Sequence, residues 1–264
     1  MKSISTGRVI SKDGTRIAFK TMGEGDAVIF VAPALADRSV FLPLAQLMAR
    51  HFTVFSYDRR GRGDSGDASA YAVDREIEDL ETIINEAGGT ASVFGGSSGA
   101  VLALEAAIHG LSIAKLALYE PPFVLDDSRP AVPGDSLDQL RKMLASGRRG
   151  DMVEYFMTKM VGVPPEAVAA MRAAPMWPAL ESLAHTLIYD VTLMGDFSLP
   201  TGTGSIKLPT LAIRGGASPE WLHQAVRAVA RAIPGAQLRM LEGQTHAVDP
   251  AVLAPVLLEF FANS

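Results

Sequence analysis

The feature that most constrains the fold is an alternation of short apolar runs with segments of helical periodicity. Continuous apolar runs are typical of strands covered on both faces, and they occupy residues 27–32, 52–57, 91–94 and 113–119. Helices are predicted between these runs, over residues 40–50, 73–87 and 98–109. Strands and helices that alternate in this way form a mostly parallel, doubly wound sheet with helices on both faces.

The two ends of the chain extend this pattern. At the start, strands are predicted over 8–11 and 16–22, joined by Lys12-Asp13-Gly14-Thr15. Asp-Gly between two such runs predicts a hairpin, because both residues tolerate a positive φ. Towards the end, the alternation resumes with strands at 210–214 and 237–241 and helices at 219–232 and 250–261.

The block between these two parts has a different character. Residues 122–206 are rich in Met, Pro and Arg, contain no clear strand, and have helical periodicity at 137–145, 152–160 and 179–194. We therefore predict an α/β core domain of residues 1–121 and 207–264. Residues 122–206 are predicted to form a helical lid inserted after the sixth strand. Such a lid would cover the carboxyl edge of the sheet, where open α/β folds bind ligands.

Composition excludes several functional classes. The 24 Lys and Arg residues against 29 Asp and Glu give a net charge of −5, which argues against nucleic acid as a partner. The absence of Cys excludes disulfides, thiolate nucleophiles and iron–sulfur clusters. No signal-peptide pattern opens the chain, and no apolar run reaches the ~20 residues that span a bilayer. We expect a cytoplasmic protein that contacts no membrane and needs no cofactor or metal. The sequence is compatible with a homodimer but does not predict one.

A candidate nucleophile lies directly after the strand at 91–94. Residues 95–99 read Gly-Gly-Ser-Ser-Gly and match the pattern G-x-S-x-G with Ser97 at the centre. The turn from strand to helix is so tight that it needs small residues two positions before and after the serine. Ser98 is an alternative, because small residues flank it too, but the position of Gly95 favours Ser97. A Gly- and Ser-rich turn without chemistry is the other interpretation.

A serine hydroxyl needs a base to take its proton. Four of the five histidines lie at the ends of predicted elements or within helices: His51, His109, His185 and His223. His246 instead lies in Gly243-Gln244-Thr245-His246, a loop that leaves the last strand at the edge where Ser97 also emerges. Loop residues on a rigid scaffold are frequent functional residues, so His246 is the predicted base.

These motifs together resemble the α/β-hydrolase superfamily. The match lies in the order and spacing of five features: Asp13-Gly14, the strand at 27–32, the Asp-Arg-Arg-Gly-Arg-Gly-Asp-Ser run at 58–65, the turn at 95–99 and Gly243-x-x-His246. The resemblance covers nearly all of the chain outside the predicted lid. It implies an α/β-hydrolase fold and a triad in the order nucleophile, acid, histidine, which Ser97 and His246 follow.

The resemblance also implies an oxyanion hole made of two backbone N–H groups. One would come from Ser98, after the nucleophile. The other would come from the loop after the third strand, where the family usually reads His-Gly and this chain reads Val31-Ala32-Pro33-Ala34-Leu35. Proline has no N–H, so Ala34 is the predicted second donor.

The position of the triad's acidic residue departs from the family pattern. The usual aspartate follows the seventh strand, where this chain has Gly215-Gly216-Ala217-Ser218. Glu120 ends the sixth strand and is the predicted substitute, a layout similar to that of zearalenone lactonases. A surface or lid-anchoring carboxylate is the other interpretation of Glu120. Weaker acid candidates are Asp126, Asp190, Asp196 and Asp249.

We therefore predict a serine hydrolase that cleaves a carboxylic ester or lactone of a mostly apolar small molecule through an acyl-enzyme. The predicted substrate contacts are Leu35, Met176, Trp177 and Tyr189. Met adapts to irregular shapes, although such residues also simply pack. The run at 58–65 is expected to be structural, its arginines paired with Asp58 and Asp64. Alternatives are a catalytically weak ligand-binding protein on the same fold, or a cofactor-free C–C hydrolase or lyase.

Overall fold

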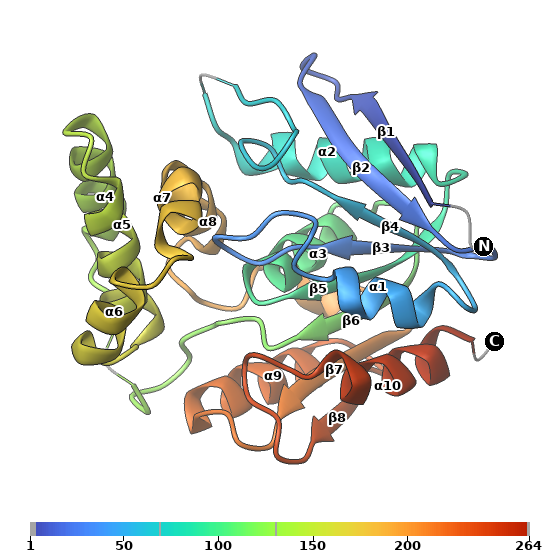
Figure 1. The fold of residues 1–264 in the computed structure, drawn as a ribbon. Coiled ribbons are helices and arrows are strands. Elements are labelled where there is room, and N and C mark those ends of the chain that lie inside the picture. Colours follow the sequence, from blue (N-terminus) through green and yellow to red (C-terminus); the bar gives the residue numbers. More distant parts are fainter. Residues whose placement is uncertain (1–3, 69, 130, 263–264) are drawn as a thin grey trace.

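A single eight-stranded sheet organises the protein (Figure 1). The computed structural model describes residues 4–68, 70–129 and 131–262. The strand order is β1-β2-β4-β3-β5-β6-β7-β8; β1 and β2 run antiparallel to their neighbours and all other pairs are parallel. The strands are β1 (Ile4–Ile10), β2 (Arg16–Met22), β3 (Ala27–Val31), β4 (Thr53–Tyr57), β5 (Ala91–Gly96), β6 (Ile113–Tyr119), β7 (Thr210–Gly215) and β8 (Gln237–Leu241). This confirms the predicted mostly parallel sheet.

The first two strands form the predicted hairpin. Gly14 has a φ of +88°, and the Thr15 N–H donates to the Asp13 carboxylate over 2.9 Å. The first strand is longer than expected, since pairing begins at Ile4 opposite Met22. The prediction missed this part because Gly7 lies within it, and glycine weakens a strand pattern.

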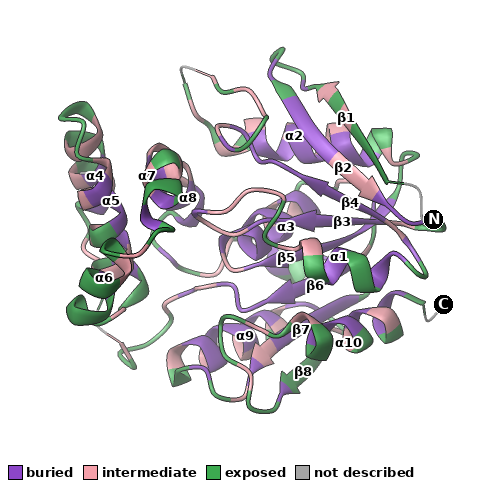
Figure 2. Cartoon of the chain, viewed as in Figure 1, coloured by how far each residue is buried: buried purple, intermediate pink, exposed green. Residues whose placement is uncertain are grey.

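Helices cover both faces of the sheet. On one face lie α1 (Leu42–Met48) and α10 (Pro250–Ala262), which share a buried cluster with β3 and β7. On the other face lie α2 (Val73–Glu86), α3 (Ser98–Ile108) and α9 (Glu220–Ala232). The central strand β5 is buried at every residue and its neighbours β3 and β6 are mostly buried (Figure 2), which explains why these strands are apolar runs in the sequence. None of the helices in the described ranges is long and apolar enough to cross a membrane.

The segment between β6 and β7 is helical. It contains α4 (Ser136–Ala145), α5 (Arg149–Tyr155), a π-helical turn (Phe156–Val161), α6 (Pro165–Arg172), α7 (Trp177–Leu183), the 3-10 turn Ala184–Thr186, α8 (Leu187–Met194) and the 3-10 turn Thr203–Ser205. Its described residues form no strand. The helices predicted over 152–160 and 179–194 are each broken, by the π-helical turn and by the first 3-10 turn. Helix α6 was missed, although Pro165 at its first turn is a start signal. The division into core and lid domains stays a prediction.

Candidate active site

Ser97 lies in a strained turn between β5 and α3. Its φ of 54° and ψ of −124° are unusual for a residue with a side chain. A Cβ at Gly95 would lie 2.4 Å from the Gly99 carbonyl oxygen, and one at Gly99 would lie 2.2 Å from the Val31 carbonyl oxygen. The turn therefore requires glycine at both positions that the sequence pattern singled out. It also brings the start of α3 against the end of β3.

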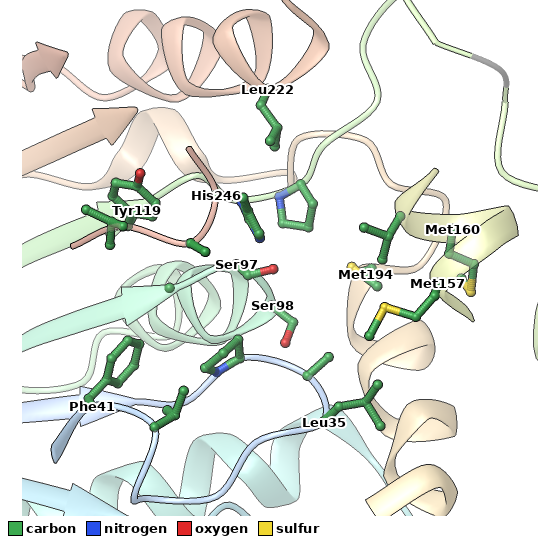
Figure 3. Close-up of a pocket in the computed structure, with 18 of the residues that line it drawn as sticks. Leu35, Phe41, Ser97, Ser98, Tyr119, Met157, Met160, Met194, Leu222 and His246 are labelled. Atoms are coloured by element: carbon green, nitrogen blue, oxygen red, sulfur yellow. The ribbon is translucent and has the colours of Figure 1, made fainter. Parts of the chain in front are cut away.

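Ser97 and His246 line one cavity of about 530 Å³. Figure 3 shows the two side chains beside one another, with Phe41, Leu222 and three methionines around the same space. No Asp, Glu, Lys or Arg is among the described residues that line it. Within the described ranges, no group of three or more His, Asp or Glu side chains could hold a metal. The cavity therefore combines a hydroxyl and an imidazole with an apolar wall.

Glu120 holds the imidazole of His246. Its Oε2 lies 2.8 Å from His246 Nδ1, and its Oε1 accepts the Gly215 N–H over 2.7 Å. Glu120 is fully buried, whereas the His246 side chain is 40% exposed. Because Nδ1 faces the carboxylate, Nε2 is the nitrogen available for proton exchange with a hydroxyl. Glu120 follows β6 and His246 follows β8, so the sheet brings together two residues that are distant in sequence.

The loop that carries His246 is tied to the turn after β7. The Gln244 carbonyl accepts the Ala217 N–H over 2.8 Å, and a Cβ at Gly215 would lie 2.3 Å from the same carbonyl oxygen. The Tyr119 hydroxyl donates to the Thr245 carbonyl. Ser218, where the family's usual acid stands, is buried, and its Oγ has no hydrogen-bond partner among the described residues. The carboxylate at His246 is thus that of Glu120.

Backbone strain is concentrated at this site. In the described part of the chain, the non-glycine residues with positive φ are Leu35, Ser97, Glu120 and Phe197. Leu35, Ser97 and Phe197 line the cavity, and Glu120 holds His246. Such conformations persist only where the surroundings impose them, and they cluster at functional sites.

The two residues predicted to form the oxyanion hole, Ala34 and Ser98, both line the cavity. The Ser98 hydroxyl, however, is already engaged in a hydrogen bond. Its Oγ donates to Asp190 Oδ1 over 2.8 Å, and the residue is 1% exposed. A hydroxyl committed to a buried carboxylate is a poor nucleophile, so this geometry favours Ser97 over Ser98.

Only one of the predicted substrate contacts lies at the cavity. Leu35 lines it. The other three are not among the described lining residues. Trp177 is buried among the inserted helices, and its Nε1 donates to Glu181. Met176 is 53% exposed, and Tyr189 stacks on Tyr71. The inserted segment instead contributes Phe156, Met157, Met160, Val161, Met194 and Phe197. Helical periodicity indicates that a stripe is apolar but not which neighbour it faces, so the sequence missed these residues.

The expectation for the run at 58–65 is wrong in its details. Asp58 and Asp64 pair with Arg38, which lies outside the run. The run's own arginines pair elsewhere, Arg59 with Glu76 and Asp190, Arg60 with Asp13 and Asp79, and Arg62 with Asp190. Neighbouring charges in a tight loop point in different directions, so they find partners on other elements.

The sequence also matches a known protein family. Residues 28–256 match the model of the alpha/beta hydrolase family, and the chain belongs to that family. This confirms the predicted α/β-hydrolase fold.

Individual proteins show the same likeness. An alpha/beta hydrolase from Sphaerobacter thermophilus DSM 20745 is 56% identical, with a TM-score of 0.94 over 97% of this chain and 100% of that one. The enol-lactonase from Burkholderia xenovorans LB400 shares the fold at 20% identity, with a TM-score of 0.72 over 97% and 100% of the two chains. The uncharacterized hydrolase YraK of Bacillus subtilis (strain 168) is 31% identical over 113 residues, which is 41% of this chain and 42% of that protein.

Proposed function

We propose that the protein is a serine hydrolase that cleaves a carboxylic ester or lactone of a mostly apolar small molecule through an acyl-enzyme. One observation carries the proposal. A strained Ser97 shares an apolar cavity with His246, whose Nδ1 lies 2.8 Å from the buried carboxylate of Glu120. Membership of the alpha/beta hydrolase family supports hydrolysis as the reaction class.

In the proposed first half-reaction, Ser97 Oγ attacks the carbonyl carbon while His246 Nε2 takes the hydroxyl proton. The carbonyl oxygen becomes an oxyanion, which the N–H groups of Ala34 and Ser98 receive. Each such donor stabilises the transition state by ~3–4 kcal/mol. The C–O bond to the leaving alcohol then breaks, and His246 returns the proton to that oxygen. In a lactone the new alcohol stays attached to the acyl chain.

In the second half-reaction a water molecule replaces the alcohol. His246 takes a proton from the water, whose oxygen attacks the acyl carbon. The bond between that carbon and Ser97 Oγ then breaks, and His246 returns the proton to Oγ, which releases the acid and regenerates the Ser97 hydroxyl. Glu120 would hold the imidazole in the required tautomer and stabilise the imidazolium formed twice in each cycle. The burial of Glu120 keeps solvent away from its carboxylate.

The cavity suits an uncharged apolar substrate. Its volume of about 530 Å³ lies in the range of small-molecule sites. No Asp, Glu, Lys or Arg is among its described lining residues, so a charged group bound there would lose its hydration without gaining a partner. We propose that residues 122–206 act as a lid, since their methionines and phenylalanines form one wall of the cavity.

Labelling with a fluorophosphonate probe tests the proposal, because the probe reacts only with an activated serine. We expect one adduct, located on Ser97 by mass spectrometry. Ser97→Ala should abolish labelling, whereas Ser98→Ala should still be labelled at Ser97. The absence of an adduct from neutral to alkaline pH would contradict the proposal and favour a ligand-binding protein. A panel of apolar esters and lactones then identifies the substrate class.

A further inference from the structure

A buried cluster of four charged side chains lies behind Ser97, and the proposed mechanism does not use it. Its members are Arg59 and Arg62 from the loop after β4, Glu76 from α2 and Asp190 from α8. None is more than 1% exposed. Two guanidinium groups face two carboxylates, so the charges balance. Buried ion pairs contribute little net stability compared with apolar packing, which invites another explanation for this cluster.

Asp190 connects the cluster to the turn at Ser97. Its Oδ1 accepts hydrogen bonds from Ser98 Oγ and from Arg59 Nη1, both over 2.8 Å. Its Oδ2 accepts one from Arg62 Nη2, also over 2.8 Å. Ser98 begins α3, and its backbone N–H is one of the two proposed oxyanion donors. The carboxylate therefore orients the residue that carries this donor.

The two arginines reach the loop that carries the other donor. Arg62 Nη1 donates to the carbonyl of Pro33 and, over 3.3 Å, to that of Ala36. Arg59 Nη1 donates to the carbonyl of Ala32 over 3.3 Å. These carbonyls lie on both sides of Ala34 in the chain. The guanidinium groups thus hold the loop backbone around Ala34.

The carboxylate stays ionised in this setting. Burial by itself raises the pKa of Asp190, but Arg62, Arg59 and the hydroxyl of Ser98 outweigh that effect and lower the pKa below its usual value. An ionised carboxylate can accept all of the hydrogen bonds at once, as the geometry requires.

We propose that Asp190 is a positioning residue that sets the spacing between the two halves of the oxyanion hole. This inference rests on the proposed function. Asp190 holds Ser98 directly, and it holds the Ala34 loop through Arg62. An oxyanion hole works only when its donors lie ~2.7–3.1 Å from the developing charge, so small displacements of either half slow the reaction. Because Asp190 belongs to α8, the inserted helices also take part in shaping the hole.

A matched pair of variants tests this role. Asp190→Asn removes a buried carboxylate that binds Ser98 directly and is linked to the Ala34 loop through Arg62. Asp79→Asn removes an equally buried carboxylate that binds Arg60 over 2.7 and 2.8 Å. Among the described residues, Arg60 contacts Asp13, Arg75 and Asp79, and none of these belongs to the turn at Ser97 or to the Ala34 loop. The control therefore reports the general cost of breaking a buried ion pair.

The measurements are kcat and KM for an apolar ester, Tm, and inhibition by a trifluoromethyl ketone, whose adduct with a serine carries an oxyanion. We expect Asp190→Asn to lower kcat about 100-fold, the loss typical of one oxyanion donor, and to weaken the inhibitor by a similar factor. The KM of this variant should stay within about threefold of the wild-type value. Asp79→Asn should lower Tm while leaving kcat unchanged.

Ser98→Ala keeps the test decisive if Asp190→Asn fails to fold. It removes only the hydroxyl that binds Asp190 and keeps the backbone N–H; we expect kcat and inhibitor affinity each to fall about tenfold. Equal kcat values in the Asp190 and Asp79 variants would overturn the inference. If Asp190→Asn does not fold, a Ser98→Ala variant with wild-type kcat would overturn it. A wild-type protein without activity or labelling would overturn the proposed function and this inference together.

Discussion

Ser97 and Ser98 are neighbours in the chain, yet the fold gives their hydroxyl groups opposite environments. Ser97 has a positive φ and lines the cavity beside His246. Ser98 has its hydroxyl bound to the buried carboxylate of Asp190. The chain passes from β5 into α3 at Ser97, whose strained backbone gives the two adjacent hydroxyl groups different surroundings. In the proposed mechanism, this separation lets Ser97 attack the substrate while Ser98 supplies only its backbone N–H.

Substitution of Glu120 tests whether this residue serves as the acid of the triad or whether Ser97 and His246 work without one. Glu120→Gln keeps the shape of the side chain but removes its charge, so the imidazolium of His246 would lose its stabilising partner. We expect kcat to fall by about 10⁴-fold, as for comparable amide substitutions, with little change in KM. Steady-state kinetics on an apolar ester measures this.

Thermal unfolding provides the control for this variant. The amide can still accept the Gly215 N–H, which Glu120 Oε1 accepts over 2.7 Å, so the Tm should stay near that of the wild type. A folded Glu120→Gln protein with kcat within about threefold of wild type would remove Glu120 from the mechanism.

At the scale of elements, the π-helical turn Phe156–Val161 forms part of the cavity wall that comes from the segment between β6 and β7. Its members Phe156, Met157, Met160 and Val161 line the space. A π-helical turn is wider than an α-helical one, and such turns are frequent at functional sites. Here it replaces the second half of a helix that the sequence predicts as continuous.

Filling the cavity from this turn should change substrate selectivity. Met157→Phe replaces a flexible side chain with a rigid ring, so bulky apolar esters should lose kcat/KM at least tenfold more than a short acetate ester. Met171→Phe on α6 is the matched control, because Met171 is also half-buried but is not among the described lining residues. Kinetics on an ester series measures both variants. Equal losses for short and bulky esters would show that Met157 does not limit the substrate.

At the scale of the whole molecule, ion pairs join separate parts of the fold around the sheet. Asp13, in the hairpin turn, accepts from Arg60 over 2.9 Å, and Arg60 also binds Asp79 on α2. Burial opposes ionisation of Asp13, but hydrogen bonds from Thr15 and Arg60 outweigh it and lower its pKa to about 2. The hairpin turn is thereby tied to a helix of the core.

This lowered pKa predicts a specific acid sensitivity. A carboxyl group whose pKa is lower in the folded state adds stability above its unfolded pKa of about 4, and that stability is lost as the pH falls through the folded value. The free energy of unfolding should therefore decrease less steeply between pH 4 and pH 2 in Asp13→Asn than in the wild type. Urea unfolding at several pH values measures it.

Asp138→Asn is the control for this prediction. Asp138 is a surface carboxylate, 70% exposed and 3.7 Å from Arg141, and such pairs contribute little. Its pH dependence should run parallel to that of the wild type. Identical slopes for the Asp13 and Asp138 variants would contradict the role of the Asp13–Arg60 pair.

The sequence by itself determined the sheet, its helices and the turn at Ser97, because these depend on local periodicity and on the small residues that a tight turn needs. It also pointed to His246, which lies in the loop after the last strand. The resemblance to the α/β-hydrolase superfamily pointed to Glu120, because Ser218 stands where the family has its usual aspartate. The contact between His246 and Glu120 was predicted from the triad that the resemblance implies, and Glu120 Oε2 lies 2.8 Å from His246 Nδ1.

Only the tertiary structure decided which residues of the segment between β6 and β7 face the cavity and which partners the buried arginines take. Met157 and Met176 look alike in the sequence, yet one lines the cavity and the other is exposed. Arg59 and Arg62 meet Asp190 across 131 and 128 residues of chain. A contact over such a distance leaves no local pattern, because it arises only when packing brings α8 against the loop after β4.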